Sequence, residues 1–177
     1  PTRRSSDLLI LLLNIIILIV LIIRFMIHTL KIKILLILIL FSSCSTQTYN
    51  DAKYFVSETS EELNCPFSDA SIVDNIIYVS GQVGTKPGTR EIVEGGISAE
   101  TTQTLNNINM VLNDLGSNSD KIFKCLCMLE DINDYAEMNN AYTTFFNGRN
   151  NLPSRSTFAG SGLALGAKIE IECWATK

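Results

Sequence analysis

Histidine is missing from the part of the chain that follows Ser45, because the single histidine of the sequence, His28, lies in an apolar N-terminal segment. This absence excludes the Ser-His-Asp and Cys-His arrangements that activate a nucleophile. It also excludes every metal site that uses a histidine ligand. Any chemistry in this part of the chain must therefore use arginine, carboxylates, hydroxyls, backbone groups and water.

Positive charge is also scarce. After residue 44 the chain has nine Lys and Arg against seventeen Asp and Glu, a formal charge of −8, and no run of basic residues. Binding to a phosphate backbone depends on such charge, so nucleic acid is not an expected partner. The glycines at 84, 88, 95 and 96 match neither GxGxxG nor a P-loop, so the sequence gives little support to nucleotide binding.

The cysteines do not form a recognisable framework. Their number is odd and no CxxC spacing occurs, which predicts neither a disulfide scaffold nor a zinc site. Two of them are two residues apart on an expected strand and so share one face. We expect the strand cysteines to be small buried hydrophobic residues. The five are Cys44, Cys65, Cys125, Cys127 and Cys173.

The apolar residues are concentrated in a leader, residues 1–44, which a polar linker at 45–51 separates from a globular domain at 52–177. The chain begins with Pro1, and PTRRSSDL resembles a translated sequencing adapter, so residues 1–25 are a candidate artefact. The apolar run 8–23 has 16 residues, fewer than the roughly 20 that a spanning helix needs.

Residues 26–44 have the layout of a secretory signal peptide: a short basic region, an apolar core, and small residues before Cys44. The end resembles a bacterial lipoprotein signal, although Phe41 is an imperfect fit. We therefore expect an exported protein, tethered to a membrane through a lipidated Cys44. The alternative is a soluble cytoplasmic protein with an amphiphilic N-terminus.

Periodicity predicts the elements of the domain. A helix is expected at 98–115, with Ser98 as N-cap and Gly116 just after its end. Asp134 and Glu137 have capping-box spacing and open a second helix. A long glycine-containing loop is expected at 81–96, and another loop at 60–68. Strands are expected at 53–57, 70–73, 76–80, 121–129, 156–159 and 167–175.

This order of elements predicts an α+β fold in which two helices pack on one face of a mixed β-sheet. The expected strands carry apolar residues on both faces, so the face without helices should associate with another copy of the chain.

Arg155 and Glu170 are the strongest candidates for chemistry. A guanidinium binds a planar carboxylate through two hydrogen bonds. On the last strand Glu170 and Glu172 share a face, and one of them facing Arg155 could orient a water or act as a general base. Both residues also have an interpretation without function. Arg155 could be an ordinary surface arginine, and Glu170 could belong to a solvated strand face. Gly81 either turns the chain or, lacking a Cβ, lets backbone groups approach a ligand.

The domain resembles the RidA/YjgF family, also called L-PSP or reactive-intermediate deaminases. The resemblance runs from about residue 53 to the end of the chain. It rests on CPFSDAS, IIYVSGQVG, EGGISAETTQTLNNINMVLNDLGSN, KCLCMLEDINDYAEMNNAYTTFF, PSRSTFA and AKIEIECWA.

The resemblance implies a chorismate-mutase-like fold and a homotrimer with clefts between subunits. It implies hydrolysis of small reactive 2-imino or 2-enamino acids to 2-oxo acids and ammonia, without metal or organic cofactor. The carboxylate-binding arginine falls on Arg155 and the water-positioning glutamate on Glu170. The remaining substrate-binding positions fall on Ser80, Gly81, Asn139, Thr157 and Phe67.

Two departures bear on substrate preference and rate. Phe67 stands where the family often has a tyrosine, and Leu163-Ala164 stands where Leu-Pro is usual.

Two other functions remain open. One is a non-enzymatic trimer that binds small carboxylates or acts like a chaperone. The other is an endoribonuclease, which an older family label suggests and which the negative charge and missing histidine disfavour.

Overall fold

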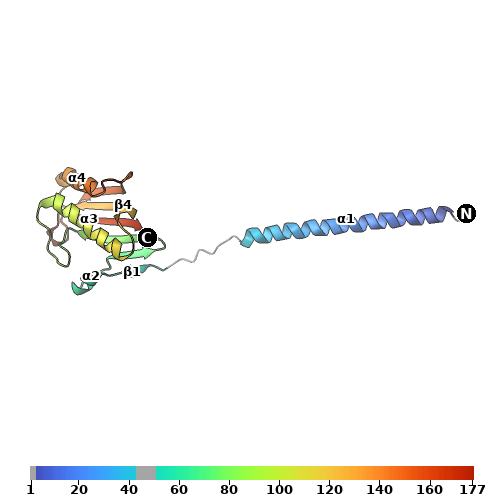
Figure 1. Cartoon of the computed structure of the whole chain (residues 1–177), viewed down its shortest axis with the longest axis horizontal. Coiled ribbons are helices and arrows are strands. Elements are labelled where there is room, and N and C mark those ends of the chain that lie inside the picture. Colours follow the sequence, from blue (N-terminus) through green and yellow to red (C-terminus); the bar gives the residue numbers. More distant parts are fainter. Residues whose placement is uncertain (1–2, 43–50) are drawn as a thin grey trace. The chain divides into compact units, whose positions relative to one another are not determined.

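A computed structural model describes residues 3–42 and 51–177 of the chain. The chain divides into two compact units, Pro1–Tyr49 and Asn50–Lys177. The first unit contains one helix, α1 (Arg3–Ser42), and the second contains the sheet and the other helices (Figure 1).

Helix α1 runs without a break through Arg24, where the sequence pattern predicted an end to the first apolar run. Its segment Ile15–Leu35, 21 residues with mean hydropathy 2.4, is long and apolar enough to cross a membrane by length and composition, a test that a signal sequence also passes. Nothing in the described part of the chain supports a cleaved signal peptide or a lipoprotein. Cys44, the proposed tether, lies outside the described residues.

The globular unit is built on one six-stranded sheet in the order β1-β2-β3-β6-β4-β5. Neighbouring strands are antiparallel except β4 and β5, which are parallel, so the sheet is mixed as predicted. The strands are β1 (Lys53–Phe55), β2 (Ala70–Val73), β3 (Ile76–Val83), β4 (Ile122–Leu129), β5 (Ser154–Ala159) and β6 (Ile169–Thr176).

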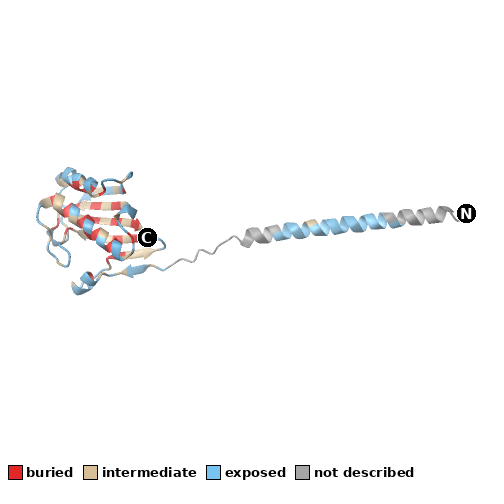
Figure 2. Ribbon diagram, in the orientation of Figure 1, coloured by how far each residue is buried: buried red, intermediate tan, exposed pale blue. Residues whose placement is uncertain are grey.

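Two helices, α3 (Gly96–Asp114) and α4 (Tyr135–Phe145), cover one face of this sheet (Figure 1). Buried residues gather where these helices meet the strands (Figure 2). Both helices bury a stripe at three- and four-residue spacing, for example Leu105, Ile108 and Leu112 of α3. The sequence-based α+β prediction is thereby confirmed.

Four local predictions need correction. Helix α3 begins two residues before Ser98, because Gly95 and Gly96 have positive φ and turn the chain there. The predicted capping box at Asp134 does not form: a short 3₁₀ turn precedes α4, and the Asp134 carboxylate lies 3.8 Å from the Lys168 ammonium.

Two segments expected to be loops contain regular structure. A helix, α2 (Glu58–Glu62), occupies part of the expected loop at 60–68. Strand β3 continues through Gly81 to Val83, with a register shift between Val79 and Gln82.

The prediction for two cysteines is also wrong. Cys125 and Cys173 are not separate buried thiols but form a disulfide between β4 and β6. They are directly opposite each other in the register of these strands, with Cα atoms 4.2 Å apart. Opposed side chains in an antiparallel pair lie on the same face and in contact, which places the two sulfurs together. Cys127 remains a free, buried thiol.

The sheet face that carries no helix, here called the open face, is aromatic. Tyr78 and Trp174 are edge-to-face at 5.1 Å, and Phe123 lies 6.4 Å from the same indole ring. Phe158 on β5 is 48% exposed. An exposed apolar surface of this kind is typical of an interface.

Candidate functional site

Arg155 and Glu170 lie on opposite faces of the sheet. Arg155 pairs in register with Cys125, which is buried on the helix-covered face of the sheet, so the Arg155 side chain lies on that face as well. Glu170 pairs with Met128, three residues along β4, and therefore belongs to the open face. The expectation that this guanidinium faces the carboxylates of β6 is wrong within a single chain. The predicted site residues divide into two groups accordingly.

The first group surrounds Arg155 and is called the arginine half-site: Arg155, Asn139, Thr157, Tyr135 and Tyr142. Arg155 lies in β5, which begins two residues before the strand expected at 156–159. Its guanidinium donates to Asn139 Oδ1 and, at 3.4 Å, to Tyr135 Oη. Its central carbon lies 4.6 Å from the centroid of the Tyr142 ring and 5.7 Å from that of Tyr135. Cation–π contacts and the amide together fix the position of the charge.

Two buried hydroxyls in this half-site have no hydrogen-bond partner among the described residues: Tyr142 Oη and Thr157 Oγ1. Burial raises the pKa of Tyr142, and it raises the pKa of the neighbouring Cys127 thiol to about 11, against the opposing effect of Arg155. Both groups are therefore neutral at physiological pH. Arg155 supplies the positive charge of this half-site, and Thr157 supplies an unused hydroxyl.

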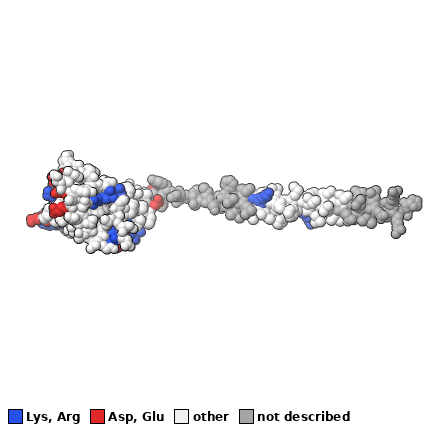
Figure 3. All heavy atoms as spheres, turned by 90° about the horizontal axis from the view of Figure 1, so that it is seen from above, with Lys and Arg blue, Asp and Glu red and all other residues white. Residues whose placement is uncertain are grey.

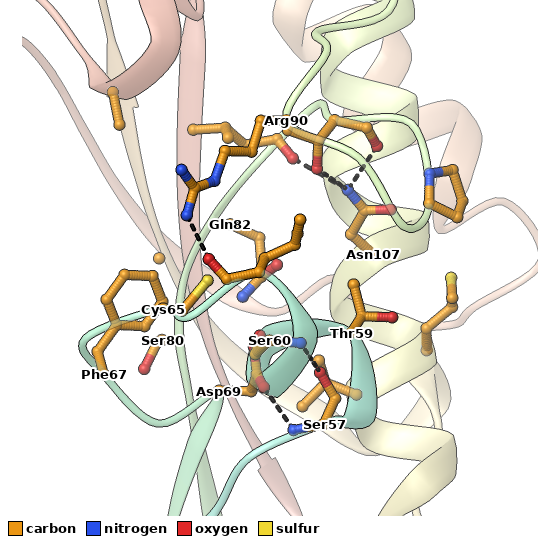
Figure 4. A pocket seen from close by; sticks show the side chains of 18 of the residues that line it. Ser57, Thr59, Ser60, Cys65, Phe67, Asp69, Ser80, Gln82, Arg90 and Asn107 are labelled. Carbon is orange, nitrogen blue, oxygen red and sulfur yellow. Dashed lines mark hydrogen bonds between the residues drawn. The ribbon is translucent and has the colours of Figure 1, made fainter.

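The second group, called the glutamate half-site, consists of Glu170, Gly81, Ser80 and Phe67, which line one cavity of about 640 Å³. Gly81 is essential to its geometry, because a Cβ at this position would lie 2.0 Å from Glu170 Oε1. Glycine thus leaves room for the carboxylate, and not merely for a turn of the chain. Figure 4 shows this cavity and several of its side chains.

The environment of Glu170 shifts the pKa of its carboxyl group upward. Burial and, second, the charge of Glu172 raise the pKa of Glu170. Glu172 itself accepts a 2.7 Å hydrogen bond from the Trp174 indole N–H, so it is already engaged. Of the two carboxylates on β6, Glu170 is the one placed at the cavity.

The remaining predicted residues of the glutamate half-site have distinct contacts. Ser80 donates its hydroxyl proton to the Ser68 carbonyl at 2.7 Å, which leaves its oxygen able to accept. Phe67 is 53% exposed and presents a ring without a hydroxyl. Ala164 lines the cavity beside Leu165, whose φ of 58° shows that the chain turns sharply here.

Three contributors were not identified as site residues from the sequence. Tyr135 and Tyr142 are seven residues apart and so share one face of α4, but this spacing does not indicate that they contact Arg155. Arg90, in the loop before α3, lines the same cavity as Glu170. Its loop position carried no pattern that could have identified it.

The comparisons with known proteins agree on one family. The family model described as Endoribonuclease L-PSP matches residues 59–177. A 2-iminobutanoate/2-iminopropanoate deaminase of Rattus norvegicus is 39% identical over 111 residues, which are 63% of this chain and 80% of that protein. The chloroplastic Reactive Intermediate Deaminase A of Arabidopsis thaliana is 34% identical over 137 residues, 77% of this chain and 72% of that one.

Solved structures show the same fold. A protein of unknown function of the conserved Rid family from Yersinia pestis is 34% identical, with a TM-score of 0.65 over 72% of this chain and all of that one. Escherichia coli TdcF, solved with bound serine, is 26% identical, with a TM-score of 0.59 over 63% of this chain and 88% of that one.

Proposed function

Because this chain belongs to the RidA/YjgF family, we propose that it hydrolyses small reactive 2-imino and 2-enamino acids to 2-oxo acids and ammonia. The relatives named as 2-iminobutanoate/2-iminopropanoate deaminases support this class of substrate. The observation that carries the proposal is the division of the site into a cationic and an acidic half. A 2-imino acid needs both: a cation for its carboxylate and a proton-transferring group for its imine.

The two halves come together only between subunits in this proposal. Within one chain Arg155 and Glu170 point from opposite faces of the sheet. A homotrimer built through the aromatic open face would place the arginine half-site of one subunit at the cavity of the next. The exposed aromatic rings of that face are the apolar surface that such association buries.

The reaction then needs positioning and proton transfer. Arg155 holds the substrate carboxylate through two hydrogen bonds, and Thr157 offers a third donor. A water attacks the electrophilic imine carbon while Glu170 takes one of its protons. Glu170 returns that proton to the imine nitrogen, which gives a carbinolamine. It then carries the hydroxyl proton of the carbinolamine to the amino nitrogen as the C–N bond breaks, which releases the 2-oxo acid and ammonia. A carboxyl group with a raised pKa is suited to both transfers.

The alternatives make different demands. A carboxylate-binding or chaperone-like trimer would use the arginine half-site and the open face but not Glu170. An endoribonuclease would need a surface for phosphates, and on the face seen in Figure 3 the basic side chains lie in separate small groups and form no continuous patch.

The test is ammonia release from 2-iminopropanoate, formed in place from alanine by an amino-acid oxidase. The full chain should accelerate release. Arg155→Ala and Glu170→Gln should each lower kcat/KM at least about a hundredfold, since each removes a charged group that acts on the substrate. Unimpaired turnover by Glu170→Gln would refute the catalytic role of this carboxylate. A wild-type chain that does not accelerate release would favour the binding module, and cleavage of RNA by the purified chain would favour the nuclease.

Mixed oligomers test the assembly. Co-expressed Arg155→Ala and Glu170→Gln subunits should regain activity, because some clefts combine an intact Arg155 with an intact Glu170. Random mixing in a ring predicts about a quarter of the wild-type sites. No recovery, with mixed oligomers verified by mass spectrometry, would refute a site shared between subunits.

A further inference from the structure

The cavity beside Glu170 is larger than a three- or four-carbon imino acid requires. Its volume of about 640 Å³ falls in the range of 300–1,000 Å³ that is usual for much larger ligands. It extends from Glu170 and Gly81 to the loop before α3 and to helix α2. A substrate held at the imine end therefore leaves a second region of the cavity for its side chain.

Arg90 is the one Lys or Arg among the described residues that line this cavity. Among the described residues, one hydrogen bond holds the guanidinium in place, from its Nη2 to the Leu63 carbonyl. In Figure 4 the side chain extends over the cavity on the side of Phe67 and Cys65. A guanidinium has five N–H donors, so most of its capacity remains for a ligand.

The charge of Arg90 is not neutralised within the described part of the chain, where it makes no ion pair. Its acidic neighbour Glu91 pairs with Lys86 at 3.0 Å. Asp69, another carboxylate at the cavity, accepts from the Ser57 backbone N–H at 2.7 Å and from the Ser60 hydroxyl at 2.8 Å. Arg90 thus has its positive charge available.

The loop that carries Arg90 is held in place before any ligand binds. Thr85 and Ile92 form an isolated β-bridge, and Val93 donates to the Gly84 carbonyl at 2.9 Å. From α3 the Asn107 amide donates to the carbonyls of Val83 and Thr85, both at 3.0 Å. A donor on an ordered loop loses little entropy on binding and so discriminates well between ligands.

We propose that Arg90 is a specificity residue that binds a second carboxylate, so that the preferred substrates are imino acids with an acidic side chain. The inference rests on the proposed function: the first carboxylate binds Arg155 of the neighbouring subunit, the imine lies at Glu170, and the distal carboxylate reaches Arg90. Charge-assisted hydrogen bonds to one distal group should give a preference of about tenfold or more.

The experiment compares two five-carbon imino acids formed in place by amino-acid oxidases, 2-iminoglutarate from glutamate and 2-iminopentanoate from norvaline. The wild-type full chain should have the higher kcat/KM on 2-iminoglutarate. Arg90→Gln should remove the preference while leaving 2-iminopentanoate turnover within about twofold, and Arg90→Lys should retain part of it. Lys86→Gln is the matched control, because this cation of the same loop is bound to Glu91 and should leave the preference unchanged.

The outcomes separate the two proposals. Hydrolysis of 2-iminopentanoate without a preference for the diacid, or a preference that survives Arg90→Gln, overturns the role of Arg90 and leaves the deaminase proposal standing. An equal loss on both substrates with a lower Tm also overturns it, since Arg90 then only links its loop to Leu63. If neither imino acid is hydrolysed, the proposed function fails. Calorimetry with 2-oxoglutarate and 2-oxopentanoate then decides the Arg90 site by itself: tenfold tighter diacid binding supports it, and equal binding refutes it.

Discussion

The arginine half-site and the glutamate half-site are built in contrasting ways. Arg155 is surrounded: two aromatic rings, an amide oxygen and, at 3.6 Å, the sulfur of Met138 contact its guanidinium. Glu170 lies at an open cavity, and the space for its carboxylate is provided by the missing side chain of Gly81. One half is positioned by what contacts it, the other by what is absent. The two should therefore respond differently to substitution.

The largest effect is expected at Gly81. A methyl group there would occupy the position of Glu170 Oε1, so Gly81→Ala should move the carboxylate and lower kcat about a hundredfold, as displacements near 1 Å do. The Glu170 side chain can rotate away, so Tm should change little. Steady-state kinetics and thermal unfolding measure the two quantities. Gly160→Ala is the matched control, because nothing lies within 4 Å of its added Cβ. Normal kcat in Gly81→Ala would show that the carboxylate need not occupy this position.

A smaller effect is expected at Tyr142, the platform under Arg155. Tyr142→Leu should raise KM by about five- to thirtyfold, since a desolvated cation–π contact contributes about 1–2 kcal/mol, with a smaller change in kcat. Tyr142→Phe keeps the ring and removes a buried hydroxyl without a partner among the described residues, so it should preserve KM and leave Tm equal or higher. Equal KM in the two variants would mean that the ring does not position Arg155.

The smallest effect concerns stability and pH. The native pKa of Glu170 is raised above its unfolded value, so its contribution to stability is present below the unfolded pKa and is lost as pH rises through the raised native pKa. Glu170→Gln should therefore gain stability relative to wild type between pH 4 and pH 7. Urea denaturation at both pH values measures the difference, with Glu137→Gln, at an exposed helix position, as control. A relative loss of stability across this window would mean that the native pKa is not raised.

Much of the fold follows from local pattern, whereas the site follows only in part. Helix stripes and alternating strands predict the order of elements because each pattern is set by neighbours along the chain. The placement of Arg155 beside Asn139 depends on parallel pairing of β4 and β5, which no local pattern encodes. The face assigned to Glu170 relative to its own strand was predictable, since alternation fixes it. Its separation from Arg155 was not, because the faces of two strands are related only by their register.

The glycine pair before α3 and the cysteine pair show the same limit. Gly95 and Gly96 start the helix before Ser98 because both have a positive φ. Glycine can adopt this angle but does not have to, so the sequence alone does not predict it. Cys125 and Cys173, 48 residues apart, meet because β6 lies between β3 and β4 in the sheet. Neither outcome can be read without the tertiary arrangement.

The buried disulfide between Cys125 and Cys173 can also report how fast the domain opens. Both cysteines are fully buried beneath α3 and α4, so a reductant reaches the sulfurs only when the helical layer separates from the sheet. Thiol–disulfide exchange requires direct attack on a sulfur, and buried regions become accessible through local or global opening. The rate at which thiols appear at saturating reductant is then the rate at which the domain opens. Alkylation followed by mass spectrometry would separate the Cys125 and Cys173 thiols from the free thiols of Cys65 and Cys127, and so would measure the opening rate of the domain.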